Sequence, residues 1–371
     1  MQRPETHPRP SLLVAVLDWG MGHATRTLPL IEHARDLGWH VHVASKGYAL
    51  EWLSGRLRGV EHVTLHHKPG PDISYAKRGN LVKIVRQLPS FLRHVEAERQ
   101  WTESFVQDHD IQAVFSDNCY GCAHPGVPSV LMSHQLQLPV PSPMKRSARK
   151  VVSHWASAFQ EVWVPDVAPG DLSLSGALAD TDIHPATHYV GVLSRLTKHR
   201  LAKPAKTWSK LGMVSGVEPH RSLMEEALKA WMADTQEPCL LVAGKPGMPP
   251  TQEGHITVWN DPEDHALAGA LQQAEVVLCR SGYSSQLDLA ALGVNAILVP
   301  TPGQPEQTML GRLWADRFGF ACIDQSALQQ GLVPERATGQ LPAHEPNALA
   351  FARMSAWLER CLASASEPLL A

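Results

Sequence analysis

The chain has 371 residues, a formal net charge of −3, 44% hydrophobic residues and 19% charged residues. This length exceeds what one hydrophobic core usually supports, so we expect two domains, and the charge balance gives no basic field that would attract nucleic acid. Six cysteines make no disulfide framework in a chain this long, and no apolar run approaches the roughly 18 residues that span a bilayer. We therefore expect a cytoplasmic protein, with the polar, proline-rich residues 1–10 as a disordered leader.

The first predicted strand, residues 12–17, is a continuous apolar run followed by a loop with the sequence GMGHATR. Residues 24–37 then carry apolar side chains at helical spacing, which predicts a strand, a glycine-containing loop and a helix. Thr25 occupies the third glycine position of the dinucleotide fingerprint, and the next strand, residues 40–44, lacks the acid that would hold an adenosine ribose. The pattern therefore disfavours NAD binding.

The remainder of the first half alternates strands with helices. Further strands are predicted at residues 62–65, 113–115, 129–132 and 161–165, and helices at 48–53 and 81–106. This alternation is typical of a doubly wound parallel sheet. Asp117 and His134 each follow a strand, where open α/β sheets bind ligands, so both are candidate catalytic bases or orienting groups. The alternatives are an Asx-turn for Asp117 and a helix cap for His134.

The predicted domain boundary lies in residues 194–210, because residues 195–210 lack periodicity and carry six Lys and Arg residues. The N-terminal domain then covers residues 11–193 and the C-terminal domain residues 211–345. Strands are expected in this second domain at 211–215, 240–243 and 258–260, with a helix at 222–232. The last segment, 346–371, is predicted to be an amphipathic helix.

In the second domain, a buried strand at residues 276–279 runs directly into the turn Arg280-Ser281-Gly282, where a helix should start. Ser281 is suited to cap that helix, and Gly282 lets the backbone approach a ligand, so free N–H groups would face an anion such as a diphosphate. Asp288 falls about two turns along the helix, where a carboxylate can accept two hydrogen bonds from a ribose diol.

A second strand, residues 295–299, is followed by a helix that begins near Pro305, a residue suited to the first turn. Gln304, Glu306 and Gln307 therefore lie where side chains reach across the crevice at the strand ends. Their donors and acceptors suit sugar hydroxyls.

These motifs resemble the donor-binding half of GT-B glycosyltransferases of the family 28 type, the group of the bacterial peptidoglycan N-acetylglucosaminyltransferase. That group carries an Arg-Ser-Gly turn, an acid eight residues after the Arg, and a later Gln/Asp-Gln pair, which correspond here to residues 280–282, Asp288 and Glu306-Gln307. Asp288 stands where Glu is usual, and Glu306 stands where Gln or Asp is usual. The sugar preference of the group therefore does not carry over.

The glycine loop of the first domain is similar to the loop that starts the acceptor domain of the same group. Gly20 and Gly22 would bring the backbone near the reacting sugar, and His23 could take a proton from the attacking hydroxyl at neutral pH. The alternative is that His23 only caps the helix. Arg26 is placed to hold a phosphate or an acceptor anion, or else is a solvated helix charge, and Arg221 lies in a loop that resembles the family segment near the donor phosphates.

The resemblance implies two Rossmann-like, doubly wound parallel-sheet domains that face each other across a cleft, with the last helix returning to the first domain. It implies an inverting, metal-independent transfer of a sugar from a nucleotide-sugar donor, a UDP-sugar, to a hydroxyl acceptor, without a cofactor. Arg280 and helix N-termini would stabilise the leaving diphosphate. The acceptor class that we consider is a lipid-linked or a polysaccharide precursor. The alternatives are a non-hydrolysing UDP-sugar epimerase and a sugar-nucleotide-binding protein without turnover.

No metal site is predicted. Cys119 and Cys122 form a lone C-x-x-C pair, the other cysteines are isolated, and the twenty histidines are scattered along the chain.

The helix predicted at residues 81–106 has an apolar face and basic neighbours, and both contact with an anionic membrane and packing on its own domain explain this pattern. The basic residues are Lys77, Arg78, Lys83, Arg86 and Arg93.

Overall fold

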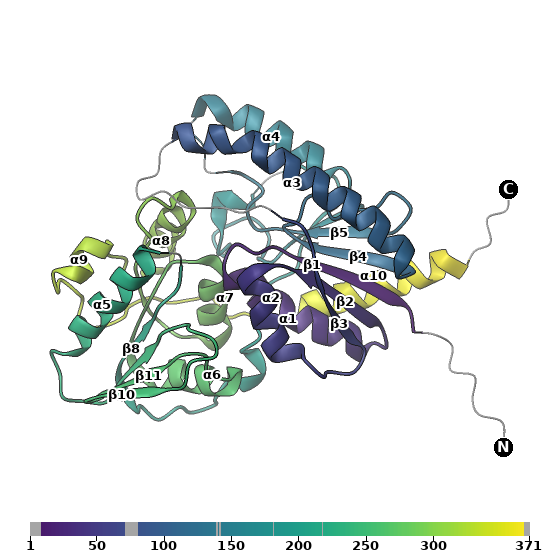
Figure 1. The fold of residues 1–371 in the computed structure, drawn as a ribbon. Helices are drawn as coiled ribbons and strands as arrows, with labels where there is room; N and C mark the ends of the chain where they lie inside the picture. The colour runs from purple at the N-terminus through teal and green to yellow at the C-terminus, as the bar shows by residue number, and fades with distance from the viewer. Residues whose placement is uncertain are drawn as a thin grey trace, which may run out of the picture.

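The computed structural model describes residues 9–70, 81–138, 140, 142–180, 182–216 and 218–366, which form two α/β lobes side by side (Figure 1). The first lobe contains a seven-stranded sheet in the order β3-β2-β1-β4-β5-β6-β7 with every pair parallel. Its strands are β1 (Ser11–Val16), β2 (His40–Ser45), β3 (Val63–His67), β4 (Ile111–Asp117), β5 (Ser129–Met132), β6 (Glu161–Val164) and β7 (Thr187–Tyr189). Its helices are α1 (Met21–Asp36), α2 (Gly47–Leu57), α3 (Leu81–Asp108) and α4 (Ser142–Ala156).

The second lobe contains a six-stranded sheet in the order β10-β11-β9-β8-β12-β13, in which only β10 and β11 pair antiparallel. Its strands are β8 (Trp208–Met213), β9 (Cys239–Val242), β10 (Thr251–Glu253), β11 (Ile256–Trp259), β12 (Ala274–Cys279) and β13 (Ile297–Leu298). Its helices are α5 (His220–Met232), α6 (Asp264–Gln273), α7 (Tyr283–Leu292), α8 (Pro305–Phe318) and α9 (Gln325–Gln329). The predicted fold class, two doubly wound parallel-sheet domains, is confirmed.

The central strand β1 shows why continuous apolar runs form these sheets. Leu12 and Val14 face the core that α1 and α2 cover, whereas Leu13 packs on the opposite face with Phe105 of α3. A strand buried on both faces needs apolar residues at every position, not at alternate ones. Helices consequently cover both sides of the sheet.

The last helix, α10 (Ala348–Ser366), lies against the first lobe although it follows the second lobe in sequence (Figure 1). Trp357 is 3% exposed, and its ring makes a T-shaped contact with Trp163 of β6, with 5.8 Å between ring centroids. Met354 and Leu358 pack in the same core. The helix therefore completes the hydrophobic core of the first lobe.

Some elements differ from the prediction. Helix α4 and the short strand β10 were not predicted, because α4 is rich in basic and polar residues and β10 is exposed along its length. Pro10 belongs to the ordered chain, since its carbonyl accepts a hydrogen bond of 2.8 Å from the His40 N–H, whereas residues 1–8 lie outside the described range.

The segment considered for membrane contact is described only in part. Lys77 and Arg78, and the side chains of Lys83 and Arg86, lie outside the described residues. Within the described part of the chain, none of the helices combines the length and the apolar character needed to cross a bilayer.

Truncation of Trp357 tests the role of α10. We expect Trp357→Ala to lower the free energy of unfolding by about 3–5 kcal/mol, because it removes a large aromatic side chain from a closely packed core. Chemical denaturation monitored by circular dichroism would measure the change. Glu359→Gln on the exposed face of the same helix is the matched control and should change stability by less than about 0.5 kcal/mol. Equal stability of the two variants would contradict the packing described above.

Candidate functional site

Polar side chains from both lobes meet where the carboxyl ends of the two sheets face each other. We call this group the Asp117 cluster, and it consists of His23 and Arg26 on α1, Asp117 at the end of β4, His134 after β5, and Glu306 in the first turn of α8. The carboxyl ends of parallel strands are where open α/β sheets bind ligands. The structure thus joins residues that lie up to 283 positions apart in sequence, since 306 − 23 = 283.

Asp117 is at the centre of the cluster and is 0% exposed. Arg26 donates from Nε to Oδ2 at 2.9 Å and from Nη2 to Oδ1, and Thr27 donates its hydroxyl to Oδ2 at 2.7 Å. Burial alone would raise the pKa of Asp117, but the Arg26 guanidinium and His23 outweigh it and hold this pKa well below its usual range. The carboxylate is therefore ionised and fully hydrogen-bonded.

His23 lies at the edge of the cluster, with its side chain 12% exposed. Its Nδ1 is 3.0 Å from Asp117 Oδ1, and because a carboxylate only accepts, this contact selects the tautomer with the proton on Nδ1. Arg26 Nη2 also lies 3.0 Å from Nδ1, but this donor already bonds to Asp117. The lone pair of His23 Nε2 is then available to accept a proton.

His134 is buried and uses both ring nitrogens. Arg26 Nη1 donates to Nδ1 at 2.9 Å, and Nε2 donates to Glu306 Oε1 of the other lobe at 2.9 Å. The ring stacks on Tyr283 of α7, with 4.1 Å between centroids and 7° between planes. Burial lowers the pKa of His134, although the hydrogen bond to Glu306 opposes the change. A neutral ring with both nitrogens occupied orients its neighbours and has no lone pair free for a substrate.

Helices α1 and α7 contact each other where both begin. Ser284 in the first turn of α7 donates its hydroxyl to the Gly22 carbonyl at 2.8 Å, and a Cβ on Gly22 would stand only 2.7 Å from the Ser284 Oγ. Gly20, which precedes α1, has φ 85° and ψ 179°, a conformation that is essentially restricted to glycine. Gly20 is thus required by its backbone conformation, and Gly22 by its close contact with the Ser284 side chain.

The residues that precede α1, α7 and α8 are Gly20, Gly282 and Gln304, and none of them caps its helix with a side chain. Uncapped N–H groups at helix N-termini, together with the helix dipole, attract anions. Because Ser284 and Glu306 bring α7 and α8 to the Asp117 cluster, the three N-termini lie around one region. This region is suited to a diphosphate.

Arg280 has a different position from the one expected of a phosphate ligand. Its guanidinium is 1% exposed and donates to the His220 carbonyl at 2.8 Å, to Gln325 Oε1 at 2.7 Å and to the Val299 carbonyl at 3.3 Å. Burial lowers the pKa of Arg280 to about 10, so it remains charged at neutral pH. The side chain thus joins α5, α9 and the residues that follow β13 inside the second lobe, and its contact with a diphosphate stays a prediction.

Ser281 and Gln307 also differ from the expected contacts. Ser281 does not cap α7; its hydroxyl donates to the Gln307 carbonyl at 2.8 Å. The Gln307 side-chain oxygen accepts from the Thr301 N–H at 2.8 Å, and its Nε2 lies 4.0 Å from the point where a Cβ on Gly282 would stand. Gln307 is therefore held beside the start of α7.

Asp288 is oriented toward the segment that links the lobes. Its oxygens accept from the Ser194 hydroxyl at 2.5 Å and from Arg195 Nη1 at 3.5 Å, and Arg195 also pairs with Asp264 at 2.7 Å. Burial raises the pKa of Asp288, which Arg195 partly offsets. Binding of a ribose diol stays a prediction, and it would require these contacts to rearrange.

Arg221 lies away from the cluster. It donates to the Ala243 carbonyl and, at 3.3 Å, to the Gly244 carbonyl, and it lies near Glu225. Tyr48 of the first lobe donates to the same Gly244 carbonyl at 3.1 Å. Arg221 therefore stabilises a turn at the lobe interface, and its contact with a phosphate stays a prediction.

Cys119 and Cys122 lie close to Glu98, and the positively charged side chain of Lys68 lies beside Glu98. The possible ligand atoms of these three residues are within 4.8 Å of one another. The ammonium of Lys68 is 2.6 Å from Glu98 and almost fully buried. Burial would lower the pKa of Lys68, but the thiols and Glu98 raise it overall, so the ammonium supplies the positive charge there.

Residues 262–347 match the model of the glycosyltransferase family 28 C-terminal domain. The matched segment lies in the second lobe of a GT-B fold. The match includes Glu306 and the turn at residues 280–282, and it supports glycosyltransferase activity. No curated protein matches this sequence significantly.

Solved glycosyltransferase structures share the fold along nearly the whole chain. The glycotransferase of kitacinnamycin is 15% identical, with a TM-score of 0.59 and coverage of 96% of each chain. MurG of Acinetobacter baumannii is 16% identical, with a TM-score of 0.52 and coverage of 95% of this chain and 100% of that one. The spinosyn rhamnosyltransferase SpnG in complex with thymidine diphosphate is 12% identical, with a TM-score of 0.55 and coverage of 96% of each chain.

Removal of the Arg26 charge tests whether the Asp117 cluster is held together as described. We expect Arg26→Met to lower the free energy of unfolding by roughly 3–5 kcal/mol, because it leaves a buried carboxylate without its charged partner. Arg35→Met is the control, since Arg35 lies on the same helix and pairs with the exposed Asp36. Urea denaturation should detect a loss of about 0.5 kcal/mol or less for the control. A similar small loss for Arg26→Met would contradict the buried ion pair.

Proposed function

We propose that the protein transfers a sugar from a nucleoside-diphosphate donor, with a UDP-sugar as the expected donor, to a hydroxyl acceptor with inversion and without a metal ion in the reaction. The observation that carries this proposal is the position of the His23–Asp117 pair. It lies directly opposite the N-terminus of α7 in a family 28 domain, with Gly22 and Ser284 in contact at 2.8 Å. A base on one lobe thus faces an anion-binding helix end on the other.

The donor side of the proposal rests on the second lobe. The uncapped N-termini of α7 and α8 would stabilise the charge of the leaving diphosphate, and the GT-B structure of SpnG was solved with thymidine diphosphate. Gln304 directly precedes α8, Glu306 and Gln307 lie in its first turn, and all three would contact the sugar hydroxyls. Since Arg280 is buried, backbone N–H groups carry most of the charge stabilisation.

The acceptor side rests on the first lobe. His23 Nε2 would remove the proton from the acceptor hydroxyl, and the ionised Asp117 would stabilise the resulting imidazolium. Attack from the first lobe on a sugar held by the second lobe displaces the diphosphate from the opposite side, which inverts the anomeric centre. Arg26 and His134 are positioning residues in this scheme, because their polar atoms contact other members of the cluster.

The acceptor class, a lipid-linked or a polysaccharide precursor, the cytoplasmic location and a peripheral membrane contact all remain part of the proposal.

Replacement of His23 tests the role of the base. We expect His23→Asn to lower kcat roughly 10²–10⁴-fold, because it removes the proposed base, while UDP affinity stays near that of the unmodified protein. The measurement is UDP release from a UDP-sugar in the presence of candidate acceptors, together with UDP affinity and melting temperature. His67→Asn, at an exposed histidine of the same lobe, is the control.

Three outcomes would contradict the proposed reaction. An unchanged kcat in folded His23→Asn would exclude His23 as the base. Isomerisation of a UDP-sugar without an acceptor would indicate an epimerase, and UDP binding without turnover would indicate a binding protein.

Chelation tests whether a metal ion takes part in the transfer. We expect EDTA to leave kcat unchanged at temperatures well below unfolding, because helix N-termini stabilise the leaving diphosphate in place of a cation. Initial rates with and without EDTA, and after addition of Mg²⁺ or Mn²⁺, would measure the effect. A rate lost with EDTA and restored by either ion would show that the transfer requires a metal.

A further inference from the structure

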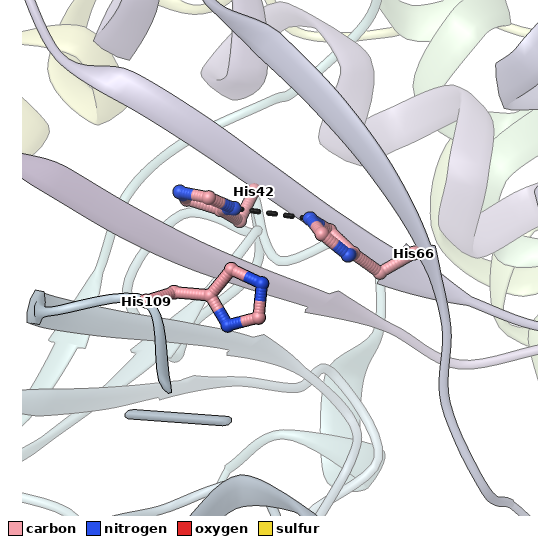
Figure 2. Close-up of side chains that lie close together, drawn as sticks. All are labelled: His42, His66 and His109. Carbon is pink, nitrogen blue, oxygen red and sulfur yellow. Dashed lines mark hydrogen bonds between the residues drawn. The ribbon is translucent and has the colours of Figure 1, made fainter. Parts of the chain in front are cut away.

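Three histidines of the first lobe point toward one another on the face of the sheet that α3 covers (Figure 2). His42 is on β2, His66 is on β3, and His109 directly follows α3. One ring nitrogen from each lies within 4.8 Å of the others, and His42 is buried while the other two are half-buried. This three-histidine cluster corrects the expectation that the histidines are scattered.

The sheet register explains how these residues meet. Ala44 of β2 pairs with His66 of β3, and His42 lies two residues before Ala44. The side chains of His42, Ala44 and His66 therefore project from the same face of the sheet. Phe105 of α3 packs on that face and stacks on His109, with 4.0 Å between ring centroids. The three imidazoles are therefore held by two strands and the end of a helix.

The ring nitrogens have the arrangement that a metal site needs. His109 Nδ1 donates to the Phe105 carbonyl at 3.2 Å, which leaves a lone pair on Nε2. Histidines that bind metals usually donate their other N–H to such an outer partner, because it fixes the tautomer and the ring orientation. The His109 ring is thus prepared to act as a ligand.

The spacing of the other two rings also fits. His42 Nδ1 and His66 Nε2 face each other at 3.0 Å (Figure 2). Two nitrogens that bind a tetrahedral zinc ion at about 2.0–2.1 Å are about 3.3 Å apart, so a small separation of the rings would admit the ion. Without an ion, one nitrogen must donate a proton to the other; with an ion, both lone pairs have a partner.

We propose that His42, His66 and His109 bind one divalent transition-metal ion of the zinc class, with water at the remaining position. Three neutral imidazoles favour zinc and its neighbours over magnesium or calcium, which prefer oxygen ligands. The ion would join β2, β3 and the end of α3, and so would stabilise one edge region of the first lobe.

This site is separate from the proposed transfer chemistry. His109 precedes β4, whereas Asp117 ends it, and the strand Ile111–Asp117 rises about 3.3 Å per residue, or about 20 Å over its length. The ion would therefore act on folding stability and not on the sugar transfer. Its removal and the failure of the proposed transfer are distinguishable by experiment.

Zinc binding by the full chain tests the proposal. After chelation and dialysis, Zn²⁺ is titrated by calorimetry, and bound metal is counted by elemental analysis. We expect one Zn²⁺ per chain and a higher melting temperature on binding. His66→Gln and His109→Gln should each weaken binding at least about 100-fold. His67→Gln is the matched control, because His67 is the neighbour of His66 on β3 and lies outside the cluster; it should bind zinc like the unmodified protein.

A second measurement needs no variant. X-ray absorption of the zinc-loaded protein should give three imidazole nitrogens at about 2.0 Å from the metal. The proposal is overturned if the protein binds no zinc, if His66→Gln and His109→Gln both bind it as tightly as the control, or if the absorption spectrum shows fewer imidazoles. Retained binding in the variants would mean that other histidines of the chain hold the ion.

Discussion

The buried charge of Asp117 is the constraint on which the arrangement of the site depends. A carboxylate without solvent must be paired and hydrogen-bonded, and here Arg26 and Thr27 meet both requirements from adjacent positions of one helix. Once Arg26 is fixed by Asp117, its Nη1 orients His134, and Asp117 Oδ1, which also accepts from Arg26 Nη2, orients His23. One ion pair thus determines which nitrogens of both histidines carry protons.

The Asp117–Arg26 ion pair lies within the first lobe, so it does not join the two lobes. Across the interface the site is joined by the hydrogen bond from Ser284 to Gly22, by the charge-assisted hydrogen bond from His134 to the ionised Glu306, and by the stacking of Tyr283 on His134. A hydrogen bond between neutral groups contributes about 1 kcal/mol, and one to a charged group about 1.5–3 kcal/mol. Separation of the lobes would break these contacts but leave the Asp117–Arg26 pair intact, because both of its members lie in the first lobe. In the proposed reaction, a donor that enters between the lobes would therefore leave the Asp117–Arg26 pair undisturbed.

Much of the fold could be predicted from the sequence, because apolar runs and glycine turns are local signals. The same reasoning selected Asp117 and His134, since both follow strands, although it could not assign their roles. Long-range partners were not predictable: Asp288 bonds to Ser194, 94 positions away, and buried Arg280 bonds mainly to backbone carbonyls. The three-histidine cluster depends on strand register, which periodicity does not determine.

The Asp117 cluster carries a net negative charge next to His23, the base of the proposed reaction. Asp117 and Glu306 carry two negative charges, Arg26 carries one positive charge, and a neutral His134 adds none. Burial would raise the pKa of Glu306, but the hydrogen bond from His134 lowers it overall, so this carboxylate is ionised as well. These four charges and neutral groups therefore leave a net charge of −1 beside His23. In the proposed reaction, this negative charge would lie next to the imidazolium formed on His23 and would stabilise it.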